Sequence, residues 1–261
     1  MAQLHIGLLA RQRTRNNVLS ALEKLPDGLN DVYDAVMNRI RSQSTDDASL
    51  ALKILSWITY AKVPLKSTVL QHAVAVTEYT KDISDDDLID VEDLVSVCVG
   101  IVTVDSESGI IRLVHYTTQT YLQSYLQSQF PTANVDIAMT CLVYLGFDVF
   151  NNPCRNKTEL EERLTKYNLY TYAALYLGEH ACGDTERHIM NRFFETFQTQ
   201  GKRDSVGQTV IYYSAWWHPF VRRTNRLLLH IVSGIGLSTI CSTLLSGLMK
   251  NDTWLFSLVE S

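Results

Sequence analysis

The chain has 261 residues, which is enough for one large domain or two small domains with cores of their own. Hydrophobic residues make up 46% and charged residues 20%, a balance that excludes an intrinsically disordered chain. The formal net charge of −5 gives no overall attraction to nucleic acid or anionic lipid, and five scattered cysteines indicate reduced thiols in an intracellular, cytoplasmic protein.

Residues 1–45 form the first predicted segment, and their pattern is helical. The stretch AQLHIGLLARQ predicts one helix, and TRNNVLSALEKLP predicts a second that stops at Pro26. From Leu29 to Ile40 the apolar residues recur every three or four positions. That spacing predicts an amphipathic helix.

Residues 46–128 follow the order of a winged helix. DDASLALKILSWITYA predicts a helix, a second runs from Ser67 to about Val76, and LIDVEDLVSVCV predicts a third. The β-branched runs GIVTVD and IIRLV flank the turn SESG and predict one small β-hairpin. HYTTQTYLQSYLQSQF adds a fourth helix.

Residues 129–222 are predicted to form a helical domain. VDIAMTCLVYLGF, TELEERLTKYNLYTYAALYLGEHA and TERHIMNRFFETFQT are its long amphipathic segments, while the region around Pro153 and the stretch GKRDSVGQ are predicted loops. Residues 223–261 predict short helices rich in Ser, Gly and Leu. The expected fold class is therefore mostly α: a helical linker, a winged helix with one small β-hairpin, then an α-helical bundle or solenoid.

The uncharged run from Leu227 to Met249 is long enough to be tested as a membrane span. It contains His230, three glycines and several serines and threonines, which make it a poor span. Two short antiparallel helices that share a core are the favoured interpretation.

Several linked motifs resemble a known family. The pattern Leu25-Pro26, Leu29 and Tyr33 resembles a segment just after the ATPase core of fungal NACHT-type STAND proteins, and AQLHIGLLARQRT resembles the helix that joins that core. ALKILSWITYAKVPLKSTVLQHAVAV and LVSVCVGIVTVDSESGIIRLVHYTTQTYL resemble their winged-helix domain, also named after GPI inositol-deacylase-like proteins. YTYAALYLGEHA resembles the helical block that follows, with Leu177 in place of the usual Trp. The resemblance covers about residues 1–185.

The chain lacks the phosphate cradle of a NACHT NTPase, G-x-x-x-x-G-K-[ST]. Its Gly201-Lys202 pair is followed by Arg203, and Thr196 stands where the first glycine belongs. The resemblance therefore implies a non-catalytic regulatory and protein-interaction region without a cofactor of its own, either the C-terminal part of a STAND protein or the product of a truncated gene. The expected partners are a NACHT domain and the targets of ankyrin repeats, not nucleic acid or membrane. Exposed apolar surface is expected on residues 1–45 and near His115, where an ATPase core would dock.

The tail resembles one degenerate ankyrin repeat. The usual Thr-Pro is replaced by Leu227-Leu228, and the remaining positions match at fixed offsets: Leu229-His230, Val232-Ser233, Gly236, Ile240 and Leu244-Leu245. Many members of the resembled family carry ankyrin repeats at this place.

His115 is the candidate cofactor-contacting residue. In STAND ATPases a histidine at the start of the last winged-helix helix approaches the bound ADP phosphate in the resting state. His115, with Tyr121 and Leu122 at the matching offsets, resembles that position, although Tyr116 replaces the usual Asp. The resemblance implies a phosphate contact only when a NACHT domain is supplied. For the isolated chain the favoured interpretation is a half-buried histidine that begins a helix and bonds to the backbone.

Other candidate sites are weaker. His180, Cys182 and His188 match no zinc spacing and are interpreted as packed helical residues, so no metal site is predicted. DISDDDLIDVED lacks the glycine and closing Glu of an EF-hand and is interpreted as a solvated loop and helix start. YYSAWWHPF is interpreted as aromatic core between helices. No nucleophile and base share a recognisable spacing, so no catalytic residue is predicted.

A DNA-binding winged helix is the alternative function. Such a domain reads DNA with its third helix and wing and must neutralise phosphates with Lys or Arg. Residues 82–111 contain nine Asp and Glu residues and neither Lys nor Arg. That charge disfavours duplex binding.

Overall fold

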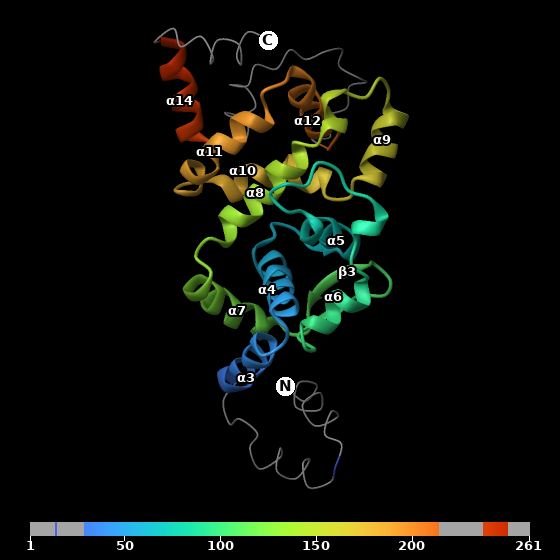
Figure 1. Cartoon of the computed structure of the whole chain (residues 1–261), viewed down its shortest axis with the longest axis vertical. Helices are drawn as coiled ribbons and strands as arrows, with labels where there is room; N and C mark the ends of the chain where they lie inside the picture. The colour runs from blue at the N-terminus through green and yellow to red at the C-terminus, as the bar shows by residue number, and fades with distance from the viewer. Residues whose placement is uncertain (1–13, 15–28, 214–236, 250–261) are drawn as a thin grey trace. The chain divides into compact units, whose positions relative to one another are not determined.

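The computed structural model describes residue 14, residues 29–213 and residues 237–249 (Figure 1). The chain divides into two compact units. The first comprises Met1–Val74 and Ile89–Pro131, and the second comprises Ala75–Leu88 and Thr132–Ser261. The described residues are mostly α-helical with one small sheet, as the sequence predicts.

The helices of the first unit follow the predicted order: α3 Leu29–Arg41, α4 Thr45–Tyr60, α5 Ser67–Ala75, α6 Val91–Val97 and α7 Tyr116–Gln129. Ser44 begins α4, because its hydroxyl accepts a hydrogen bond from the backbone N–H of Asp47. Two acidic residues in the first turn of α4 also suit the positive end of the helix dipole.

The sheet has one strand more than the predicted hairpin. Strands β2 Val102–Val104 and β3 Ile110–Leu113 pair antiparallel, and β1 Leu65–Lys66 pairs with the other side of β3, giving the order β1-β3-β2. Strand β1 has only two residues, so it shows no alternation that a sequence pattern could reveal.

The predicted apolar face of α3 is buried, which corrects one expectation. Val32, Tyr33, Val36, Met37 and Ile40 are at most 2% exposed, because α3 packs against α4 and α7. Docking surface was expected over residues 1–45, but within the described residues 29–45 these side chains already belong to the core of the first unit.

The second unit contains the short 3-10 helices η1 Asp85–Asp87 and η2 Asp148–Asn151 and the helices α8 Ala133–Leu145, α9 Lys157–Lys166, α10 Tyr170–Ala181, α11 Thr185–Thr196, α12 Gln200–Tyr213 and α14 Ser238–Met249. Helix α8 packs against α10 and α11. The ring centroids of Phe150 and Tyr170 lie 4.1 Å apart. Both rings belong to a group of buried rings that also includes Tyr144 and Phe147. These aromatic rings form the centre of the core.

The long predicted segment over 158–181 is two helices. Helix α9 ends at Lys166, where the N–H of Tyr167 still bonds to the carbonyl of Arg163, and α10 begins at Tyr170. Tyr167 is buried at this break and packs against Phe150. This packing holds the turn between α9 and α10 in place.

The stretch GKRDSVGQ, predicted as a loop, lies inside α12. Its polar side chains are buried on backbone carbonyls: Lys202 Nζ lies 2.6 Å from the oxygen of Gly146, and Ser205 donates to that of Phe150. Gly201 allows this close approach, since a Cβ there would collide with the carbonyl of Asn151. The loop prediction was wrong because the buried face of α12 is polar, and backbone carbonyls of neighbouring segments accept hydrogen bonds from it.

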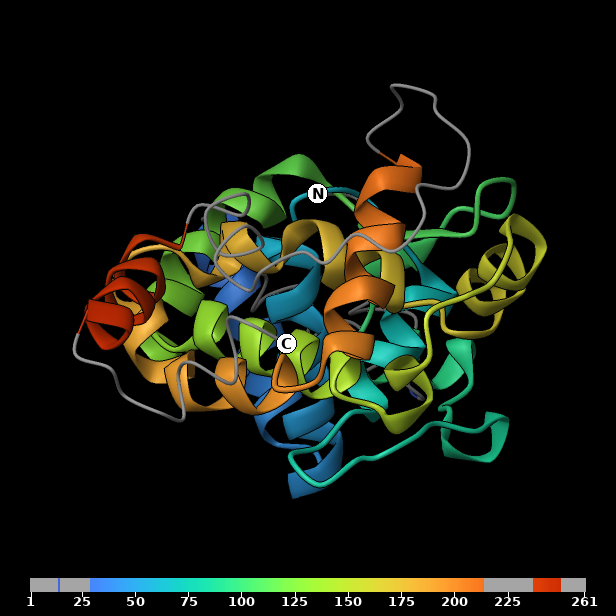
Figure 2. The ribbon, with the colours of Figure 1, turned by 90° about the horizontal axis from the view of Figure 1, so that it is seen from above.

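Helix α14 lies beside α11 in both views (Figures 1 and 2). Glu186, on α11, is 1% exposed, and its carboxylate accepts the backbone N–H groups of Thr239 at 2.6 Å and Ile240 at 3.0 Å. The residues of the predicted ankyrin motif from Leu227 to Gly236 lie outside the described residues. Ile240, the motif's next position, is buried in α14.

Candidate functional site

Two places determine the backbone of the hairpin that precedes His115: the residues just before β2 and the turn between β2 and β3. At the start of β2, Val99 and Gly100 both have positive φ, 53° and 86°. A β-branched residue rarely adopts this conformation, and the burial of the Val99 side chain, which is 8% exposed, offsets the strain. At the turn, Asp105 accepts hydrogen bonds from Ser108 and Glu107, and those from Ser108 chiefly lower the pKa of its carboxyl group.

His115 answers a local need at the strand-to-helix junction. Its backbone is extended, with φ −149° and ψ 148°, and Nδ1 accepts the backbone N–H of Thr117 at 3.2 Å. An imidazole nitrogen here takes the place of the oxygen that usually caps a helix start. The backbone bond predicted for the isolated chain is thus present.

A chain of hydrogen bonds fixes the tautomer of His115. Thr118 Oγ1 donates to Tyr33 Oη at 3.0 Å, Tyr33 Oη and Thr117 Oγ1 lie 2.7 Å apart, and Thr117 Oγ1 lies 2.7 Å from His115 Nδ1. Nδ1 accepts the backbone N–H of Thr117, so it carries no proton and Thr117 Oγ1 donates to it. Since Thr117 Oγ1 then has no proton left, Tyr33 Oη donates to Thr117, and the donations run from Thr118 through Tyr33 and Thr117 to Nδ1. The ring proton is therefore on Nε2.

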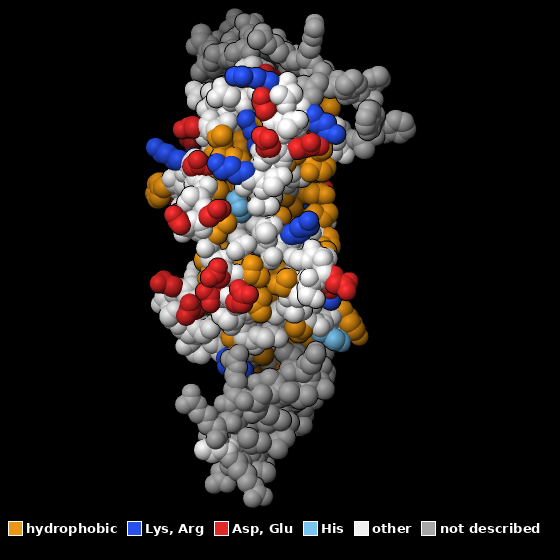
Figure 3. Space-filling view, turned by 90° about the vertical axis from the view of Figure 1, so that its right-hand side faces the viewer, with side chains coloured by type: hydrophobic (Ala, Val, Ile, Leu, Met, Phe, Trp, Pro, Cys, Tyr) orange, Lys and Arg blue, Asp and Glu red, His pale blue; other side chains and the backbone are white. Residues whose placement is uncertain are grey.

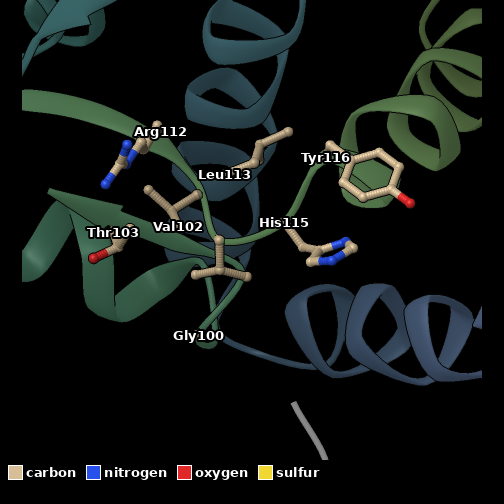
Figure 4. A pocket seen from close by; sticks show the side chains of 8 residues that line it. Gly100, Val102, Thr103, Arg112, Leu113, His115 and Tyr116 are labelled. Carbon is tan, nitrogen blue, oxygen red and sulfur yellow. The ribbon is translucent and has the colours of Figure 1, made fainter. Parts of the chain in front are cut away.

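An open hollow of about 600 Å³ runs along the outer side of the hairpin, and we call it the hairpin trough. Figure 4 shows Arg112 and Thr103 toward one end and His115 with Tyr116 toward the other. Tyr116 is 78% exposed, and its ring centroid lies 4.5 Å from that of His115. The lining residues are Gly100, Val102, Thr103, Arg112, Leu113, Val114, His115 and Tyr116.

The hairpin trough offers hydrogen-bond donors to an acceptor or an anion. Its lining residues include Arg112, Thr103 and His115, which carry donor groups, and none of the lining residues has a carboxylate. Nε2 has no acceptor among the described residues. Arg112 is bonded to Asp105 at 3.1 Å, but both side chains are solvent-accessible, so that ion pair contributes little and can be exchanged.

Residues 37–133 match the family model described as GPI inositol-deacylase, winged helix domain. This match includes every residue of the hairpin trough and the whole of α7. It confirms the winged-helix part of the predicted resemblance.

A curated protein of Monascus ruber is similar over a longer stretch. "Azaphilone pigments biosynthesis cluster protein L" is 26% identical over 210 residues, which cover 70% of this chain and 42% of the relative. The chain thus spans less than half the length of that protein. No solved structure matches the chain.

The remaining residues of the His115 motif lie on α7 of the winged-helix domain. Leu122 is fully buried, whereas Tyr121 is half-buried and donates to Asp34 at 2.5 Å. Burial, and then this bond, raise the pKa of Tyr121 above its ordinary value. The sequence could not reveal Tyr33, since it lies more than 80 positions before the threonines that it joins to His115.

The two histidines and the cysteine considered as metal ligands each bond to partners of their own. His180 is buried and bonds to Tyr172 and Asn134, His188 bonds to the carbonyl of Asp184, and Cys182 donates to that of Gly178. The described residues contain no group of three or more side chains that could hold a metal ion. His180 is packed as interpreted, whereas Cys182 and His188 are exposed, so that interpretation was wrong for these two.

The third helix of the winged-helix domain and the segment before it are acidic at the surface. Asp90 lies at the start of α6, and Glu92 and Asp93 are exposed in its first turn. Figure 3 shows a group of acidic side chains on the face that is turned toward the viewer. A duplex would meet negative charge on the helix that should enter its groove.

Two further stretches are settled in part. Tyr212 and Tyr213 are 38% and 46% exposed at the end of α12, so the predicted aromatic core does not include them, and the rest of YYSAWWHPF lies outside the described residues.

Within the described part of the chain, none of the helices is long and apolar enough to cross a membrane.

Proposed function

We propose that this chain is a non-catalytic regulatory and protein-interaction module whose winged-helix domain restrains a nucleotide-binding domain. The observation that carries the proposal is the geometry of His115. Its Nδ1 is held by Thr117, which leaves Nε2–H as the remaining ring donor of a residue that lines the hairpin trough. A fixed donor that has no acceptor within the described residues suits a group supplied by another domain.

The other features of the hairpin trough support a phosphate-bearing partner. Arg112 and Thr103 provide further donors, and Tyr116 exposes an aromatic ring beside His115. The resembled STAND family uses a histidine at this position to contact ADP in the resting state. By this proposal His115 contacts the diphosphate while the domains are closed and loses the contact when they separate.

The proposed protein partners are a NACHT-type NTPase domain and the targets of an ankyrin-like array. The Monascus ruber relative is more than twice as long as the stretch that it shares with this chain, which leaves room in such proteins for further domains. Under the proposal the chain works in the cytoplasm as part of a signalling protein and does not itself hydrolyse a nucleotide.

Transcript mapping tests where the nucleotide-binding domain comes from. The 5′ end of the transcript is determined and read together with the genomic sequence upstream of Met1. The proposal predicts an in-frame G-x-x-x-x-G-K-[ST] segment on the same transcript. A transcript that starts at Met1 would leave a stand-alone helical module and remove the nucleotide contact of His115.

Duplex binding by the purified chain would support the alternative function instead. We expect no salt-dependent retention of duplex DNA in a filter-binding experiment, because α6 and the residues before it are acidic. Micromolar, salt-dependent affinity would overturn the regulatory interpretation, and so would ATP turnover by this chain alone.

A further inference from the structure

The segment Ala75–Leu88 of the second unit carries a hydroxyl group in an unusual setting. Between the end of α5 at Ala75 and Leu88 its one helical element is η1, and Tyr79 is 83% exposed. Ile83 is 6% exposed and anchors the segment, while its neighbour Ser84 is exposed. The next three residues are aspartates.

Ser84 is held by a single carboxylate. Its backbone N–H and its Oγ both donate to Asp87 Oδ2, each at 2.8 Å, and these two bonds hold the pKa of Asp87 below its ordinary value. The backbone of Ser84 is extended, with φ −116° and ψ 167°. Ser84 is therefore an exposed residue whose hydroxyl closes the short turn that begins η1.

We propose that Ser84 is a phosphorylation site for an acidophilic serine/threonine kinase. Kinases of this class hold an extended substrate and bind acidic residues that follow the serine with Arg and Lys side chains. In the reaction Ser84 Oγ attacks the γ-phosphorus of ATP, the bond from that phosphorus to the β-phosphate oxygen breaks, and ADP leaves. The hydroxyl proton passes to the catalytic base of the kinase.

Four other Ser or Thr residues have an acidic residue three positions later. Ser20 and Ser257 lie outside the described residues, and Ser44 and Thr158 are poorer substrates than Ser84. Ser44 precedes Asp47, but its Oγ caps α4 by accepting the Asp47 N–H. Thr158 precedes Glu161, but it lies within α9. A kinase would have to unwind the first turn of either helix to bind the chain in extended form, whereas Ser84 begins only the three-residue η1.

Phosphorylation reverses the interaction that closes the turn. The phosphate has no proton to donate to Asp87, and it carries nearly two negative charges among Asp82, Asp85, Asp86 and Asp87. Like-charge repulsion therefore opens the turn next to the anchor residue Ile83. The modification thus loosens the segment Ala75–Leu88.

The test uses the full chain, casein kinase II as the acidophilic kinase, ATP, and mass spectrometry of the product. Among the described residues we expect one phosphate, on Ser84, which Ser84→Ala abolishes and Ser44→Ala leaves in place. Asp87→Asn keeps an acceptor for the Ser84 N–H but loses the charge, and should slow the reaction about tenfold, the value of one charge-assisted contact. Phosphate on Ser44 or Thr158 instead of Ser84, or unchanged incorporation in Ser84→Ala, would overturn the assignment.

Amide hydrogen exchange of the phosphorylated chain tests the consequence. The N–H of Asp87 bonds to the carbonyl of Ser84, and that of Leu88 to the carbonyl of Asp85. We expect both to exchange about tenfold faster after phosphorylation, while amides of α9 keep their rates. Unchanged exchange at Asp87 and Leu88 in fully phosphorylated protein would contradict the proposed opening.

Discussion

At the scale of single residues, His115 combines a structural task with an Nε2–H donor that has no acceptor among the described residues. Nδ1 completes the start of α7, which explains a histidine at a strand-to-helix junction without a neighbouring acid or metal ligand. The chain of donations from Thr118 through Tyr33 and Thr117 then leaves the ring proton on Nε2. A Ser or Asp could cap the helix equally well, but neither would present an N–H in the hairpin trough.

Removal of the Thr117 hydroxyl tests this chain of hydrogen bonds. Thr117→Val keeps the backbone N–H that bonds to Nδ1, but breaks the links to Tyr33 and to the His115 ring. We expect the free energy of unfolding to fall by about 1–2 kcal/mol, roughly 1 kcal/mol for each lost bond. Urea unfolding measures the change. Thr120→Val, on the exposed side of the same helix, is the control, and an equal effect in both variants would refute the network.

Because of the buried thiol of Cys98, we expect the folded protein to lose stability at alkaline pH. Cys98 is fully buried at the end of α6, and burial raises its pKa from 9.0 to about 12. Below pH 9 the thiol is protonated in both states, whereas above it only the unfolded chain releases the proton, so stability falls as pH rises. Between about pH 8 and 10.5 this group alone should cost about 2 kcal/mol.

Urea unfolding of Cys98→Ala at the two pH values isolates that contribution. The variant should lose about 2 kcal/mol less than the wild type between them, whatever its stability at pH 8. Cys182→Ser, at an exposed position, is the matched control and should follow the wild type. Parallel behaviour of Cys98→Ala and wild type would show that Cys98 does not drive the alkaline loss.

At the scale of elements, apolar spacing predicted the helices whose faces meet an apolar core. The residues Val32, Val36 and Ile40 of α3 illustrate this, as all are buried. Helix α12 escaped prediction because its buried face is Lys202, Arg203, Ser205 and Thr209, whose partners are backbone carbonyls of other segments or of its own turns. The sequence of α12 alone contains no pattern that indicates those acceptors.

The candidate site was predictable in position but not in geometry. The sequence places His115 at the start of a helix after a strand, and both elements are present. Its tautomer depends on Tyr33, which belongs to α3 and is brought to α7 only by packing. Glu186 was missed for the same reason, since its partners Thr239 and Ile240 lie more than 50 residues away.

Glu186 should decide whether α14 stays docked on α11. Glu186→Ala leaves the N–H groups of Thr239 and Ile240 without their carboxylate, and we expect a loss of about 2 kcal/mol in local stability. Amide exchange in α14 reports the loss directly. Glu195→Ala removes an exposed carboxylate of the region where α11 ends and should leave α14 unchanged. Full protection of α14 in Glu186→Ala would contradict this role.

At the scale of the whole molecule, the chain consists of two compact units, and residues 37–133 within it match a winged helix domain. Its net charge is −5, and the helix that would read DNA is acidic. Both features disfavour contact of this domain with a duplex. The central claim is that His115 serves a nucleotide-binding domain.

Nucleotide retention tests that claim most directly. The complete product of the mapped transcript is purified, and the nucleotide bound to it is quantified for wild type, His115→Ala and His188→Ala. The last replaces an exposed histidine on α11 as the matched control. We predict that ADP copurifies with wild type and His188→Ala, and that His115→Ala retains about tenfold less, because one charge-assisted contact to phosphate is lost. Equal retention by His115→Ala, or no bound nucleotide in any of the three proteins, would contradict the account.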